Sequence, residues 1–104
     1  MRISTIEHAA IQVAAAELLP AGFRVALFGS RTDDKRRGGD LDLLIEPPVA
    51  MDPQAVVEMR TRLAARLYRV LGERRIDIIV TQGVADDRLI VAEARRQAIA
   101  LVHT

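Results

Sequence analysis

Three aspartates, Asp40, Asp42 and Asp77, lie in the mainly apolar segments DLDLLIE and RIDIIV of this 104-residue chain. A carboxylate among apolar residues is costly unless it is paired, hydrogen-bonded or bound to a metal. Residues two apart in a strand share a face, so we expect Asp40 and Asp42 to point the same way. If the two strands are neighbours, all three carboxylates converge, and a divalent cation would remove their repulsion. Hard oxygen ligands in so small a number suit Mg²⁺, which keeps water and recruits phosphate oxygens.

A Gly-Ser pair, Gly29 and Ser30, follows another apolar run and precedes a polar loop. Glycine permits positive φ and close backbone approach, so the turn can present amide N–H groups and the Ser30 hydroxyl to an anion. Arg31 is the cation best placed beside it for phosphate. The pattern is not a Walker phosphate loop, because no GxxxxGK[ST] occurs. It is not an EF-hand loop either, because Leu44 and Ile45 stand where an oxygen ligand and a glycine are needed.

Each of these features also has an ordinary structural explanation. Asp40 can cap the end of a loop, and Asp77 can pair with Arg74 or Arg75 at an exposed strand edge. The cluster Lys35-Arg36-Arg37 can be a solvated part of the loop, or it can neutralise phosphate charge. Three acids in two strands, together with a Gly-Ser turn, favour a metal and phosphate site over three separate structural explanations.

The first element expected to support this site is a helix over Thr5–Leu19. Ser4 and Glu7 have the spacing of a capping box, and Pro20 to Gly22 end the helix. An apolar stripe at helical spacing runs along it, made of Ile6, Ala9, Ala10, Val13 and Ala16.

A second helix is expected from Asp52, as N-cap, and Pro53 to Leu71, with Gly72 as its stop. Its predicted inward residues are Val56, Leu63, Leu67 and Val70. Its arginines, Arg60, Arg62, Arg66 and Arg69, lie on other faces. We interpret them as a solvated helix surface, because no aromatic residues accompany them for base stacking, and direct nucleic-acid binding is not expected.

Strands are expected at Phe23–Phe28, Leu41–Ile45 and Arg75–Thr81, with a short edge strand at Ile99–Val102. The run Arg31–Gly39 has no apolar residue and must be a loop, so the first two strands suit an antiparallel hairpin. A third helix, capped by Asp86 or Asp87, is expected to end near Gln97. The order α-β-β-α-β-α, with a final β, predicts an α/β (α+β) fold in which helices pack on a small mixed sheet of three to four strands.

The composition is that of one ordinary globular domain spanning 1–104. The net charge of +1 gives no indication of a nucleic-acid partner. Cysteine is absent, which excludes disulfides and thiol chemistry and fits a reducing cytoplasm. No apolar run approaches the length of a membrane span, and charged residues in the N-terminal segment speak against a signal peptide. No role is assigned to His8, His103 or Tyr68.

The combined pattern, GSRTDDKRRGGDLDLLIE followed by RIDIIV, resembles the minimal nucleotidyltransferase (MNT) family of the DNA polymerase beta-like superfamily. That family has Gly-Ser, a variable loop, Asp-x-Asp in a strand and a third acid in a later strand. The resemblance covers most of the chain and implies the nucleotidyltransferase fold. It implies that Asp40, Asp42 and Asp77 are catalytic metal ligands, and that Gly29, Ser30 and Arg31 bind the nucleotide.

Thr32 and Gly39 depart from the family, in which many members have Ala and Ser at these two positions. Neither position supplies a metal carboxylate, so the departures bear on the geometry of the loop more than on the chemistry.

The resemblance implies transfer of a nucleoside monophosphate from ATP or another NTP to a hydroxyl, with two Mg²⁺ ions as cofactor. Because the chain is too short for a separate acceptor domain, we expect a partner to supply the acceptor. Minimal members resemble antitoxins paired with a HEPN ribonuclease toxin, so such a toxin is the expected partner, with a hetero-oligomer as one expected assembly. Two alternatives stay open: a catalytically silent antitoxin that acts by contact alone, and a subunit that modifies a small molecule such as an antibiotic.

Overall fold

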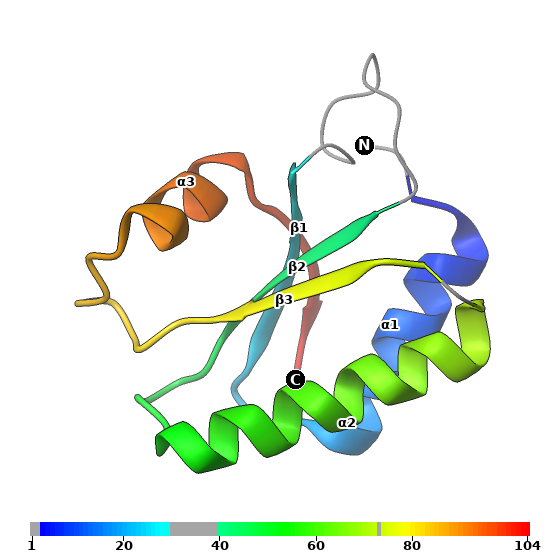
Figure 1. The fold of residues 1–104 in the computed structure, drawn as a ribbon, viewed down its shortest axis with the longest axis horizontal. Coiled ribbons are helices and arrows are strands. Elements are labelled where there is room, and N and C mark those ends of the chain that lie inside the picture. The colour runs from blue at the N-terminus through cyan, green and yellow to red at the C-terminus, as the bar shows by residue number, and fades with distance from the viewer. Residues whose placement is uncertain (1–2, 30–39, 73) are drawn as a thin grey trace.

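A mixed sheet with helices on both faces is formed by residues 3–29, 40–72 and 74–104, which are the residues that this computed structural model describes (Figure 1). The elements are α1 (Thr5–Leu18), β1 (Arg24–Phe28), β2 (Leu41–Glu46), α2 (Pro53–Leu71), β3 (Ile76–Val80), α3 (Leu89–Gln97) and β4 (Ile99–His103). The predicted order and fold class are confirmed, including the short final strand. Within these residues, no helix is both long and apolar enough to cross a membrane.

The sheet has the strand order β3-β2-β1-β4. β1 runs antiparallel to β2 and to β4, and β2 runs parallel to β3. The β1–β2 pair is the predicted antiparallel hairpin, whereas the parallel pair requires α2 as its crossover. This topology makes β2, with its two aspartates at the start, a neighbour of β3.

The main core lies between the sheet and the pair α1–α2. Alternate residues of β2, Leu41, Leu43 and Ile45, are fully buried in it, as predicted. The opposite face of the sheet carries α3 (Figure 1). Leu44 and Val91 are also buried but lie outside the main core, so β2 is covered on both faces over part of its length. The acids at its start lie beyond that doubly covered part.

Helix α1 begins with the predicted capping box. The Glu7 backbone N–H donates to Ser4 Oγ, and the Ser4 N–H donates to Glu7 Oε1, each over 3.0 Å. The predicted apolar stripe is not the packed face, however, because Ile6 and Val13 are exposed while Ile11 and Ala14 are buried. Apolar residues occur nearly all round this helix, so periodicity alone does not select the side that packs. The face is fixed instead by tertiary contacts.

Helix α2 begins at Pro53 with Asp52 as its N-cap and ends at Leu71 with Gly72 as its C-cap, as predicted. Val56, Leu63 and Leu67 are buried, but the prediction for Val70 is wrong, since it is 55% exposed. Val70 lies in the last turn of the helix.

Helix α3 starts later than predicted and is not capped by either candidate aspartate. Its N-cap is Arg88, whose side chain makes no capping bond. Asp86 instead accepts from the backbone N–H groups of Gln82 (2.8 Å) and Arg88 (3.2 Å), which closes the turn before the helix. The Arg88 side chain and these amides hold the pKa of the Asp86 carboxyl well below its usual range.

Candidate active site

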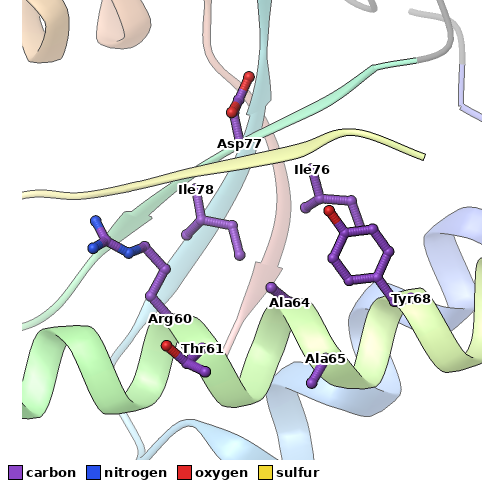
Figure 2. A pocket seen from close by; sticks show the side chains of 8 residues that line it. All are labelled: Arg60, Thr61, Ala64, Ala65, Tyr68, Ile76, Asp77 and Ile78. Atoms are coloured by element: carbon purple, nitrogen blue, oxygen red, sulfur yellow. The ribbon is translucent and has the colours of Figure 1, made fainter. Parts of the chain in front are cut away.

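Asp42 and Asp77 face each other across the parallel pair β2–β3, where they are register partners. On its other side Asp42 pairs with Phe28, the last residue of β1. Since paired residues share a face of the sheet, the three form a row across three strands. Figure 2 shows Asp77 pointing away from α2 while Ile76 and Ile78 point toward it, so the carboxylates lie on the face opposite α1 and α2. The expectation that the two acidic strands are neighbours is confirmed.

The electrostatics at Asp42 reflect this convergence. Burial raises the pKa of its carboxyl, and the charges of Asp77 and Asp40 and a hydrogen bond with Asp77 raise it further. The nearby Arg75 guanidinium lowers it, but only in part. Asp40, directly before β2, thus acts on Asp42 through its charge. A carboxyl group in this setting is more stable when it is protonated, or when a cation is bound beside it, than as an unpaired anion.

Asp77 lies opposite Asp42 and also forms one of the ion pairs considered for it. Its carboxylate faces Asp42, and its Oδ2 also lies 3.1 Å from Nε of Arg75 in an exposed ion pair. An exposed pair of this kind contributes little to stability and is readily exchanged. Arg74, the other candidate partner, binds Glu7 instead, with 2.6 Å between Nη1 and Oε2.

The donor set can be compared with the needs of Mg²⁺. Among the residues that the structure describes, no three acidic or histidine side chains are close enough to hold a metal by themselves. Two facing carboxylates, with Asp40 adding negative charge, leave further coordination positions to water and phosphate oxygens. This distribution fits Mg²⁺, which is held by one or two carboxylates and its substrate in many phosphoryl-transfer sites.

Gly29 is fitted closely against Asp42. Its φ is +77°, and a Cβ built on it would stand 2.2 Å from Asp42 Oδ2, well inside contact distance. Glycine is therefore required here on two grounds, the left-handed backbone and the carboxylate beside it. This contact joins the Gly-Ser turn to the acidic row.

The Gly29 N–H donates to Oε1 of Gln97 over 3.0 Å. This N–H is one of the groups predicted to bind an anion. Gln97 is the last residue of α3, and its Nε2 donates to Oε1 of Glu93 one turn earlier (3.1 Å). Arg96 also pairs with Glu93. A side chain 68 residues away thus holds the proposed phosphate turn, and nothing in the sequence around Gln97 distinguishes it from any other polar helix terminus.

Ser30 and Arg31, and the loop cations Lys35-Arg36-Arg37, lie outside the described residues. Their predicted roles in binding phosphate stay predictions.

One cavity borders Asp77 but does not belong to the carboxylates. It measures about 540 Å³ and lies between α2 and β3, lined by Arg60, Ala64 and Tyr68 of the helix and by Ile76 and Ile78 of the strand (Figure 2). The Asp77 side chain points away from it. The acids therefore meet on the opposite face of the sheet, outside this cavity.

The sequence matches no protein-family model and no curated protein. Its fold is similar to that of a chain in the "Crystal structure of the toxin-antitoxin with AMP-PNP". The TM-score is 0.66 at 18% sequence identity, over 93% of this chain and 73% of that chain. At this identity the likeness shows the fold, which is consistent with the nucleotidyltransferase fold implied by the sequence pattern.

Proposed function

We propose that this protein is a Mg²⁺-dependent nucleotidyltransferase that acts as an antitoxin on a partner toxin. The observation that carries the proposal is the pairing of Asp42 with Asp77, next to a glycine that admits no side chain. The neighbour's description supports it, because that structure contains a toxin–antitoxin and a nucleotide analogue, AMP-PNP. The proposed donor is ATP, with another NTP as the alternative.

The reaction would form a bond between the acceptor oxygen and the α-phosphorus of the NTP, and break the bond to the bridging oxygen of pyrophosphate. Asp40 and Asp42 would hold Mg²⁺ beside the phosphates. When bound, Mg²⁺ supplies positive charge that stabilises the transferring phosphoryl group. Asp77, opposite Asp42, would share in holding the cation, and its carboxylate would orient the acceptor hydroxyl and draw its proton.

The phosphate side of the site would be formed by the turn at Gly29. Ser30 and Arg31 follow it directly in the sequence and would orient the leaving pyrophosphate and neutralise its charge. Gln97 would keep the turn at a fixed distance from Asp42. Alignment of the donor with the acceptor is the main contribution that such a small site can make.

The proposed acceptor is a hydroxyl of the toxin, and a HEPN ribonuclease is the class of toxin that the family resemblance implies. The proposal is tested by incubating the protein with labelled ATP, Mg²⁺ and the product of the adjacent gene. We expect label on that product, and none with Asp42→Asn. Full neutralisation of the toxin by Asp42→Asn without any labelling would instead identify an antitoxin that acts by contact alone. Label on an antibiotic or metabolite would identify a small-molecule transferase.

A further inference from the structure

An apolar groove runs between α1 and α2 on the outer side of the helix layer. It measures about 340 Å³ and is lined by Ile6, Ala10, Val13 and Ala14 of α1 and by Arg66 and Val70 of α2. We call it the α1–α2 groove. It contains most of the apolar stripe that the sequence shows on α1 and that the core does not use.

The large side chains around this groove are well exposed. Ile6 is 72% exposed, Val13 54% and Val70 55%. Single exposed apolar residues are ordinary on protein surfaces, but these three border one concave site. A contiguous apolar site of this kind is typical of a surface that binds another protein.

The shape of the groove suits a helix. Glu17, near the end of α1, pairs with Arg66 of α2, and Glu7, in the first turn of α1, pairs with Arg74, which follows the end of α2. The two helices are therefore antiparallel neighbours. A third helix can lie along the furrow between them. Ala10 and Ala14 are small, which lets a third helix approach to the spacing of about 8–10 Å that packed helices adopt.

The charge beside the groove indicates which helix would bind. Arg66 lines the groove, and Arg62 and Arg69 lie four residues before it and three residues after it on α2. Residues at these spacings share one side of a helix, so the three arginines lie together beside the groove, and we call them its basic flank. Arg66 already pairs with Glu17. We propose that the α1–α2 groove binds an amphipathic helix of a partner protein, with apolar residues in the groove and carboxylates against Arg62 and Arg69. Identifying that partner as the toxin rests on the proposed function, whereas the preference for an acidic helix does not.

A second copy of this chain is a poorer occupant. A symmetric dimer whose two-fold axis crosses the groove would bring the two basic flanks face to face, because each flank then meets its own copy. Like charges facing each other across an interface cost affinity and suppress wrong partners.

Two helical peptides of about 18 residues, enough for a few helical turns, test the proposal. Both carry leucines at one-face spacing, and they differ only in having glutamates or lysines beside that face. We expect the acidic peptide to bind the full chain in a fluorescence anisotropy titration at least about tenfold more tightly than the basic one. The Arg62→Glu/Arg69→Glu variant should lose a similar factor, and Arg60→Glu, on the other flank of α2, should not.

The apolar contribution has a matched control. Val13 and Val57 are similarly exposed, at 54% and 50%, but only Val13 lines the groove. We expect Val13→Asn to weaken binding of the acidic peptide and Val57→Asn to leave it unchanged, with circular dichroism confirming that both variants fold. Binding of the toxin should follow the same pattern.

Equal binding of the two peptides, no binding of either, or equal effects of Val13→Asn and Val57→Asn would overturn the inference. So would a dimer of the wild-type chain in sedimentation that Val13→Asn dissociates. Failure of the proposed function gives a different pattern, in which no nucleotide is transferred although the acidic peptide still binds selectively.

Discussion

The Asp42 carboxylate lies against the backbone of Gly29, beside the pair that Asp42 forms with Asp77. The carboxylate oxygen of Asp42 occupies the place where a side chain at position 29 would begin. This arrangement explains why a glycine stands at the end of β1, and it does so without any appeal to phosphate binding. It also makes position 29 more sensitive to substitution than a left-handed glycine that has open space around it.

We expect Gly29→Ala to destabilise the fold by about 1–3 kcal/mol from backbone strain alone, and by more because of the collision with Asp42. Gly72→Ala is the matched control, since Gly72 has a similar φ of +83° but nothing within 4 Å of the added Cβ. Urea denaturation measures both variants. Equal losses of stability in the two variants would show that the collision with Asp42 is unimportant. If the collision matters, the double variant Gly29→Ala/Asp42→Ala should lose less stability than the sum of the two single variants.

The raised pKa of Asp42 predicts how its neutral counterpart behaves. The pKa of an ordinary aspartate is 3.8, and that of Asp42 in the folded protein is higher. The stability that protonated Asp42 contributes is therefore fully present below pH 3.8 and is lost as the pH rises through the folded-state pKa. At about pH 7, Asp42→Asn should therefore melt at a higher temperature than the wild type, and near pH 4 the difference should shrink. Mg²⁺ should raise the melting temperature of the wild type more than that of the variant. A variant that melts lower than the wild type at both pH values would contradict this reading.

The contacts of single residues can be predicted from the sequence to different extents. The pairing of Asp42 with Asp77 was predictable, because a carboxylate inside an apolar strand needs a partner. Gln97 was not, because glutamine at a helix end is common and its contact with Gly29 depends on how α3 lies on the sheet.

Among the elements, α3 has two functions: it covers part of one face of the sheet, and its last residue holds the turn after β1. We expect Gln97→Ala to weaken binding of a non-hydrolysable ATP analogue about tenfold, in the range that supporting hydrogen bonds contribute to ligand sites. Arg96→Ala, which breaks only the exposed pair with Glu93, should not change that affinity. Calorimetric titration measures both.

Rescue by Gln97→Glu gives a second readout for the same contact. Glutamate keeps the oxygen that accepts from the Gly29 N–H, but it places a negative charge near the proposed phosphate site. Gln97→Glu should therefore be more thermally stable than Gln97→Ala, while its affinity for the nucleotide stays low. Normal affinity in Gln97→Ala would show that the Gly29 turn does not need this contact.

The elements themselves follow from local signals to different extents. Ser4 with Glu7, and Asp52 with Pro53, mark two helix starts because capping is a short-range interaction. The start of α3 was misplaced because Asp86 binds backbone amides of its own turn instead of capping the helix. The packed face of α1 includes Glu7, whose partner Arg74 lies far along the chain, and no local pattern reveals that pairing.

At the scale of the whole molecule, the Glu7–Arg74 pair joins the start of α1 to the segment between α2 and β3. The Glu7 carboxylate is largely buried, and Arg74 also donates to the Leu71 carbonyl over 2.9 Å. We expect Arg74→Ala to cost about 3 kcal/mol, because it leaves a buried carboxylate without its cation. Arg62→Ala, at an exposed position on α2, is the control. A loss no larger than that of the control in urea denaturation would contradict a structural role for the pair.

The sheet separates two surfaces that have different tasks in the functions proposed above. Asp77 points away from α2 (Figure 2), so it and its register partner Asp42 lie on the face of the sheet that carries α3 (Figure 1). The α1–α2 groove lies between the two helices that cover the other face. A helix held in the groove of one molecule is therefore not itself presented to the aspartates of that molecule. The modified hydroxyl must come from a distant part of the bound protein, or from a toxin held by a neighbouring antitoxin. In the second case, mixing an Asp42→Asn chain with a Val13→Asn chain would restore labelling that neither chain supports alone. In the first case, the mixture would stay unlabelled.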